Sequence, residues 1–91
     1  MYSIMIKKVY IAMDSISPDD KKRILIQILS NEILEEQTLI DENTNLYEVG
    51  LDSMATMQLL IRIEQRIGVQ IPSSKLTKEN LSTVSNLALI I

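Results

Sequence analysis

Ser53 carries the most informative hydroxyl of this chain, in the segment Leu46-Tyr47-Glu48-Val49-Gly50-Leu51-Asp52-Ser53-Met54. An apolar-periodic segment begins at Asp52-Ser53, and this pattern predicts a helix that starts there. Free backbone N–H groups and the positive end of the helix dipole favour an anion at such a position. Because the chain contains no His and no Cys, no histidine of this chain can activate Ser53, and any thiol has to be supplied from elsewhere.

Several chemistries of Ser53 itself are disfavoured by what surrounds it. A Ser–Lys hydrolase is conceivable, but no Gly-rich nucleophile elbow flanks the serine. Metal ligands are confined to carboxylates, and the acidic segment does not match the EF-hand pattern. With only Gly50 and Gly68, the chain has no Gly-rich phosphate loop. A plain helix-capping role for Ser53 or Asp52 stays open, but their context favours a site that another enzyme modifies.

Composition indicates one small helical domain. The chain has 91 residues, of which 46% are hydrophobic but only 3% aromatic, and the two Gly and two Pro suit a helical bundle better than a turn-rich β fold.

No segment approaches the roughly 18 uninterrupted apolar residues that span a bilayer. A net charge of −3 argues against a general nucleic-acid binder. The lack of Cys is compatible with a reducing compartment, and a cytoplasmic location is the default expectation.

Residues 1–16 are expected to be an N-terminal extension, and residues 17–91 the domain proper. A short amphipathic helix and a flexible segment are both open for the extension, whose apolar residues recur at helical spacing. These residues are Tyr2, Met5, Ile6, Val9 and Met13. Lys7-Lys8 interrupts them and no cleavage site follows, so we do not interpret them as a secretory signal. Met13 is an alternative natural start.

The first helix is predicted to run from Pro18, with Ser17 as N-cap, to about Leu34. Its inward stripe comprises Ile24, Leu25, Ile28 and Leu29. Residues 35–52 form a long connection, a feature that is often functional in small domains. We expect Leu39, Leu46 and Val49 to pin this connection to the core, and Asn43 and Asn45 to favour turns.

The second helix is predicted over residues 53–67, ended by Gly68 in a left-handed conformation. Residues 69–72 read as extended, and residues 73–81 hold at most a short helical turn, with Leu76 and Leu81 facing inward. A last helix starts at Ser82 or Thr83. Its apolar stripe comprises Val84, Leu87, Ala88 and Ile91.

The second helix carries two opposed apolar faces. One arc suits the core and comprises Thr56, Leu59, Leu60, Ile63 and Ile67. Met54, Met57 and Ile61 lie roughly opposite, bordered by Glu64. Packing under the long connection is one interpretation of this second arc. An exposed patch for partners is the other, and we favour it because methionine repacks readily and the arc begins beside Ser53.

Acidic residues follow one another without an intervening Lys or Arg over the end of the first helix and the connection. They are Glu32, Glu35, Glu36, Asp41, Glu42, Glu48 and Asp52. A solvated acidic loop and a surface that steers basic partners are both consistent with this run.

In these features the chain resembles the acyl carrier proteins, and most closely the peptidyl and aminoacyl carrier domains. The segment from Leu46 to Met54 is similar to their motif aromatic-aromatic-Glu-Leu-Gly-Gly-Asp-Ser-hydrophobic. The run Met57-Gln58-Leu59-Leu60-Ile61-Arg62-Ile63 and the tail Asn80-Leu81-Ser82-Thr83-Val84-Ser85-Asn86-Leu87 extend the likeness over about residues 18–91.

The resemblance implies an all-α, right-handed bundle of three main helices and one short one. It implies that Ser53 receives 4′-phosphopantetheine from coenzyme A through a phosphopantetheinyl transferase, and that the thiol of this arm holds cargo as a thioester. Asp52 would offer a charge to the transferase, and Gly50 and Leu51 would shape the loop that it approaches.

The resemblance also implies partners and a non-catalytic role. Met54, Met57, Ile61 and Glu64 would contact partner enzymes: an adenylating or acyl-loading enzyme, and a downstream synthase or transferase. The expected protein is a monomer without a metal site, a membrane span or a nucleic-acid partner.

This chain departs from the family pattern in two respects. Leu51 replaces the second Gly of the motif. The second helix has Ala55, Gln58 and Gln65 where acids are frequent, and Arg62 and Arg66 add positive charge. The less acidic second helix favours an aminoacyl, peptidyl or specialised acyl carrier over a fatty-acid carrier. An unmodified helical interaction module and an intrinsic Ser53 esterase remain the competing classes.

Overall fold

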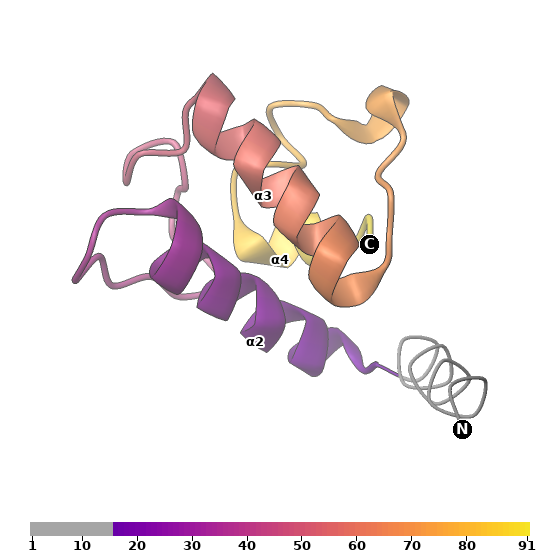
Figure 1. Ribbon diagram of the computed structural model, residues 1–91, viewed down its shortest axis with the longest axis horizontal. Coiled ribbons are helices and arrows are strands. Elements are labelled where there is room, and N and C mark those ends of the chain that lie inside the picture. Colours follow the sequence, from indigo (N-terminus) through magenta and orange to yellow (C-terminus); the bar gives the residue numbers. More distant parts are fainter. Residues whose placement is uncertain (1–15) are drawn as a thin grey trace.

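The computed structural model describes residues 16–91, and the predicted extension lies almost wholly outside them. In chain order the elements are α2 (Pro18–Ile28), the π-helical turn η1 (Leu29–Ile33), α3 (Ser53–Ile67), the 3-10 turn η2 (Ser73–Lys75) and α4 (Val84–Ala88) (Figure 1). No strand occurs within the described residues. The predicted all-α bundle of three main helices and one short one is therefore confirmed. The division at residues 16 and 17 stays a prediction.

Helix α2 begins where the capping residues indicate. The Ser17 hydroxyl accepts a hydrogen bond from the Asp20 amide at 3.2 Å, and Pro18 occupies the first helical position. The helix continues into η1, which ends as the Leu34 amide donates to the Leu29 carbonyl at 2.8 Å. This wider turn is of the kind that inserts one extra residue into a helix.

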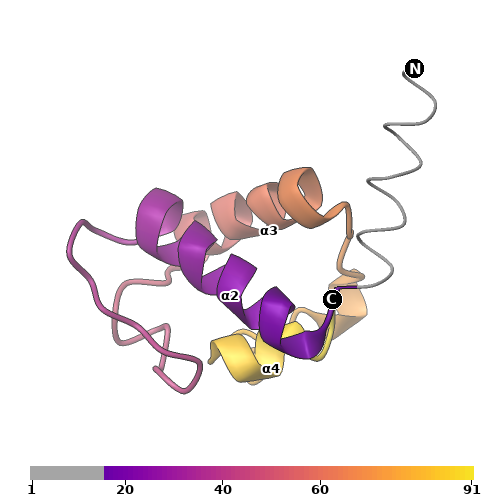
Figure 2. The same ribbon diagram turned by 90° about the horizontal axis from the view of Figure 1, so that it is seen from below.

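The core lies between the three α-helices, with α2 packed against α3 on one side and α4 on the other (Figure 2). Leu25, Ile28 and Leu29 from the first helical segment are fully buried, as are Leu59 and Ile63 of α3 and Val84 and Leu87 of α4. Ile24, Thr56 and Leu60, which we expected to face the core, are only half-buried. Fewer side chains of α3 are thus buried in the core than the sequence pattern predicted.

The connection from residue 34 to residue 52 is held by a single fully buried side chain, Leu46. Its amide donates to the Ser82 carbonyl at 2.8 Å, and its carbonyl accepts from the Leu51 amide at 2.9 Å. Val49 is half-buried against the core, and Leu51 is buried. The connection is therefore fixed both to the segment that precedes α4 and to the start of α3.

The expectation that Leu39 packs into the core is wrong, since this side chain is 93% exposed. Its neighbour Ile40 is half-buried against the core instead. A turn closed by the Thr38 amide and the Glu35 carbonyl at 3.2 Å, with Gln37 at φ 67°, precedes this pair. Consecutive residues of an extended segment point to opposite sides, so only one of the two can face inward.

In the second half of the chain, α3 ends and α4 begins at residues predicted from the sequence. Gly68 adopts a left-handed conformation with φ 80° and ends α3. The Thr83 hydroxyl accepts from the Asn86 amide at 3.1 Å and caps α4. Leu81 is buried, while Leu76 and Ile91 are half-buried. Among residues 16–91, no helix is both long and apolar enough to cross a bilayer.

Candidate modification site at the start of α3

The start of α3 is capped by Asp52, and Ser53 is the first helical residue. Asp52 Oδ1 accepts from the Ala55 amide at 2.8 Å, and the Asp52 carbonyl accepts from the Thr56 amide at 2.8 Å and from Thr56 Oγ1 at 2.7 Å. Ser53 is exposed. Its hydroxyl makes no hydrogen bond within residues 16–91, so the helix does not need it as a cap.

This helix start suits a phosphodiester on the serine oxygen. Within the described chain, the amides of Ser53 and Met54 donate no hydrogen bond. Asp52 accepts from the next two amides, those of Ala55 and Thr56. Free amides at a helix N-terminus, together with the helix dipole, stabilise an adjacent phosphate. The residues present therefore fit a phosphate-linked group at Ser53.

The loop before the serine is shaped by Gly50 and Leu51. Gly50 has φ 114°, a conformation that residues with a side chain rarely adopt, and its carbonyl accepts from the Asp52 amide at 3.0 Å. Leu51 is only 2% exposed. The leucine that replaces the second glycine of the motif thus anchors the loop from inside, which leaves Gly50, Asp52 and Ser53 at the surface.

Three apolar side chains of α3 extend from Ser53 along the outer face of the helix. Met54 is 71% exposed, Met57 66% and Ile61 50%, so they form the exposed stripe of α3 and do not pack under the connection. Glu64 is exposed at the end of this stripe, where its Oε1 accepts from Gln70 Nε2 at 2.9 Å. The structure thus brings the predicted partner residues and Ser53 onto one helix surface.

An ion-pair cluster that the sequence did not reveal lies beside this stripe. Glu32 of η1 contacts two arginines of α3: its Oε2 lies 2.8 Å from Arg66 Nη2, and its Oε1 lies 3.6 Å from Arg62 Nε. The two arginines, which we interpreted as added positive charge on α3, therefore share a carboxylate from a different helical segment. The four-residue spacing of the two arginines is visible in the sequence, but their pairing with Glu32, which lies 34 residues before Arg66, is not.

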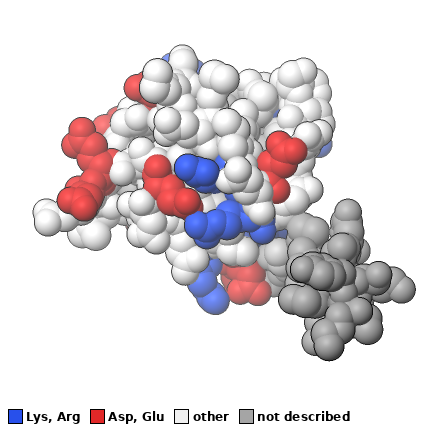
Figure 3. All heavy atoms as spheres, viewed as in Figure 1, with Lys and Arg blue, Asp and Glu red and all other residues white. Residues whose placement is uncertain are grey.

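Figure 3 shows acidic atoms gathered at the left, over the connection, and further acidic groups next to the basic atoms near the middle of the molecule. Two members of the acidic run are paired, since Glu32 contacts the arginines and Glu42 lies 3.4 Å from Lys22 Nζ. Within residues 16–91, no group of three or more acidic side chains is close enough to hold a metal ion.

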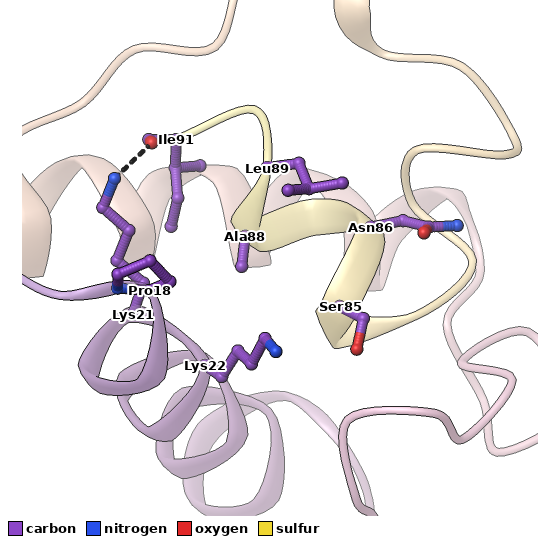
Figure 4. A pocket seen from close by; sticks show the side chains of 8 residues that line it. All are labelled: Pro18, Lys21, Lys22, Ser85, Asn86, Ala88, Leu89 and Ile91. Carbon is purple, nitrogen blue, oxygen red and sulfur yellow. Dashed lines mark hydrogen bonds between the residues drawn. The ribbon is translucent and has the colours of Figure 1, made fainter.

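Another cavity lies away from Ser53, between α2 and α4 (Figure 4). It measures about 490 Å³ and is lined by both helices, among others by Lys21, Lys22, Ser85 and Leu89. Lys21 Nζ donates to the Ile91 carbonyl oxygen at 2.8 Å, and Lys22 is paired with Glu42. Both cations are thus engaged in contacts within the fold.

Comparison with known proteins places these features in a family. Residues 23–91 match the family described as phosphopantetheine attachment site. A D-alanyl carrier protein of Listeria monocytogenes is 50% identical over 58 residues, covering 57% of this chain and 74% of that protein. A D-alanyl carrier protein of Enterococcus faecalis is 47% identical over 53 residues, covering 52% and 68%. An acyl carrier protein homolog of Ureaplasma parvum is 44% identical over 45 residues, covering 48% and 58%.

A solved structure shows the same fold. It is the crystal structure of a Bradyrhizobium japonicum glycine:[carrier protein] ligase complexed with glycylated carrier protein. The similarity has a TM-score of 0.64 at 24% identity and covers 81% of this chain and 97% of that chain.

The chain belongs to the phosphopantetheine-binding carrier proteins. It is a carrier protein whose prosthetic group is covalently attached 4′-phosphopantetheine.

Proposed function

We propose that Ser53 is the residue that bears the phosphopantetheine arm. The proposal rests on the exposed hydroxyl of Ser53, which makes no hydrogen bond within residues 16–91. The amides of Ser53 and Met54 are free, and the preceding Asp52 caps the helix. When bound, the arm supplies a terminal thiol that holds cargo as a thioester. The amides of Ser53 and Met54 stabilise the phosphodiester, and Asp52 keeps the helix start in place.

Attachment uses coenzyme A and a phosphopantetheinyl transferase. Ser53 Oγ forms the new bond to phosphorus, the pyrophosphate bond of coenzyme A breaks, and 3′,5′-ADP leaves. The serine proton goes to a base of the transferase, since the chain contains no His and Ser53 has no basic partner within residues 16–91. Gly50 leaves the approach to Ser53 free of a side chain, and the Asp52 carboxylate lies at the same surface.

The cargo we propose is a D-alanyl group. Relatives from Listeria and Enterococcus, 47–50% identical to this chain, are named D-alanyl carrier proteins. Helix α3 has Ala55, Gln58 and Gln65 where fatty-acid carriers frequently have acids, and this composition also favours an aminoacyl cargo. An adenylating enzyme would load D-alanine onto the thiol, and a downstream transferase would receive it.

The surface that meets these enzymes is the exposed stripe of α3 with Glu64. Met54, Met57 and Ile61 present exposed apolar side chains on one helix face that starts beside Ser53. An enzyme that binds the exposed stripe of α3 therefore has the modified serine at the edge of the contact surface. Because methionine side chains repack readily, one stripe can fit several partners in turn.

The chain itself has no catalytic role in this proposal, because Ser53 lacks an activating base. The protein acts as a monomer in the cytoplasm, where coenzyme A and the adenylating enzyme are found. An intrinsic Ser53 esterase would instead show turnover by the purified, unmodified protein, and we expect none.

Intact mass after incubation with coenzyme A, Mg²⁺ and a promiscuous transferase tests the attachment site. We expect a gain of one phosphopantetheine that is absent in Ser53→Ala and retained in Ser74→Ala, a matched exposed serine on η2. No gain with several transferases would instead support an unmodified interaction module. Cargo is tested next, by loading the modified protein with a D-alanine-adenylating enzyme, ATP and D-alanine, with L-alanine and glycine as competitors.

A further inference from the structure

A cavity opens beside Asp52, the residue before Ser53, between the end of η1 and the loop that precedes α3. It measures about 400 Å³. Asp52, which precedes the serine, forms part of its wall together with Val49 and Gly50, and Leu34 and Glu35 form the opposite side. A group attached to Ser53 therefore begins one residue along the chain from the wall of this cavity.

One part of the cavity wall is apolar and uncovered. Leu34 and Val49 are half-buried and pack against the core from the two sides of the cavity. A Cβ atom at Gly50 would lie 3.9 Å from Leu34 Cδ2, in ordinary van der Waals contact. The absence of a side chain at Gly50 thus leaves this stretch of Leu34 available to an aliphatic ligand.

The other part of the wall is negatively charged. Glu35 and Asp52 contribute carboxylates, and Thr38 contributes a hydroxyl, whereas no Lys or Arg lines this cavity. Within residues 16–91, Glu32 and Glu42 of the same acidic run have ion-pair partners, but Glu35 has none. An unpaired carboxylate beside an apolar wall suits a small ligand that has a short aliphatic part and an ammonium group.

We propose that this cavity binds the end of the chain's own arm when that arm carries an amino acid with a free α-ammonium group. Glu35 pairs with the ammonium, and Leu34 and Val49 contact the aliphatic atoms. The inference rests on the proposed attachment of the arm at Ser53. Because the arm is tethered at the residue next to Asp52, its effective concentration at the cavity is high, so a weak contact suffices to populate the bound state.

The same reasoning predicts selectivity for the charge of the cargo. A neutral acyl group of equal size offers Glu35 nothing to pair with, and the unloaded thiol likewise carries no positive charge. The cavity therefore distinguishes the aminoacylated arm from the empty one. The α2–α4 cavity offers no such site, because its charged lining residues are lysines.

Two stable analogues test this proposal. Pantetheine arms that end in a D-alanyl amide or in a propionyl amide differ only in the amino group, and each is attached to Ser53 by the transferase. Intact mass first establishes that both are attached. Methyl resonances of Leu34 and Val49 and the amide resonance of Glu35 are then compared with those of the unmodified protein.

We expect the D-alanyl arm to shift these resonances at least about twofold more than the propionyl arm. Glu35→Gln removes the difference, and Glu36→Gln, a matched exposed control that does not line the cavity, retains it. Equal shifts for the two arms, or shifts confined to residues outside the cavity such as Leu60 and Ile71, would overturn the proposal. A mass gain without these shifts contradicts this inference alone, whereas failure of attachment contradicts the proposed function as well.

Discussion

Asp52 and Ala55 close the first turn of α3, with Asp52 Oδ1 accepting from the Ala55 amide at 2.8 Å. The residue that stabilises the helix start is therefore the neighbour of the residue proposed to be modified. Ser53 can change chemically without removal of the cap. The sequence left capping and modification as alternatives for the Asp52-Ser53 pair; the structure assigns the capping to Asp52, and modification of Ser53 is our proposal.

Asp52→Ala is expected to lower the free energy of unfolding by about 0.5–2 kcal/mol, since it removes an N-cap acceptor. Asp52→Ser keeps an acceptor and is expected to retain most of this stability. Ser53→Ala is expected to stay within about 0.5 kcal/mol of the unsubstituted protein. Urea denaturation followed by circular dichroism measures all three. A loss for Ser53→Ala as large as that for Asp52→Ala would show that the serine is the cap.

Gly50→Ala is expected to destabilise the protein by about 1–3 kcal/mol, because alanine is strained at φ 114°. It is also expected to slow attachment of phosphopantetheine, since the strain falls in the loop before Ser53. Gly68→Ala provides the control, because it too places alanine at positive φ but at the far end of α3. If both variants slowed attachment equally under conditions where both are folded, the effect would reflect general destabilisation.

Glu32→Gln is expected to cost at most about 1 kcal/mol, because the pairs with Arg62 and Arg66 are partly exposed. The loss should shrink in about 1 M NaCl, where the Debye length falls to about 3 Å. Thermal unfolding at low and high salt measures this effect, with Glu36→Gln as an exposed control. A loss that is unchanged by salt would indicate a packing role for Glu32.

Met57→Glu is expected to change the free energy of unfolding by less than about 0.5 kcal/mol, since the side chain is 66% exposed. Loading by the adenylating enzyme should slow about tenfold or more if the exposed stripe of α3 is the contact surface. Denaturation and an initial-rate loading assay measure the two quantities. Unfolding of this variant would place Met57 in the core, and unchanged loading would remove it from the contact surface.

Ile63→Asp should behave in the opposite way, because Ile63 is fully buried on the inner side of the same helix. A buried, unpaired carboxylate costs several kcal/mol, and a loss above about 4 kcal/mol removes most of the stability of a small domain. Far-ultraviolet circular dichroism and the urea midpoint are the measurements. A cooperative transition near that of the unsubstituted protein would contradict the core assignment.

Helix boundaries were the most predictable part of this fold, because each depends on a few adjacent residues. Ser17 and Thr83 cap helices through their own hydroxyl groups, and Gly68 ends α3 in the conformation that glycine tolerates best. The opposed faces of α3 also follow from local periodicity.

Contacts between distant segments were not predictable in the same way. Leu39 and Ile40 are both apolar, and only the turn before them decides which one faces the core. Glu32 meets Arg62 and Arg66 because η1 and α3 pack together, which no local pattern indicates. The cavity beside Asp52 likewise joins residues from two segments of the chain.

The anchoring of Leu46 fixes the position of Ser53 relative to the rest of the bundle. Through its hydrogen bonds to Ser82 and Leu51, this buried residue ties the start of α3 to the segment that precedes α4. Ser53 is thus a stationary pivot, and an arm attached there sweeps a volume whose centre is fixed relative to the whole bundle. For an enzyme bound to the outer face of α3, the attachment point of the arm therefore has a fixed position, and no rearrangement of the carrier is needed to bring the thioester within reach.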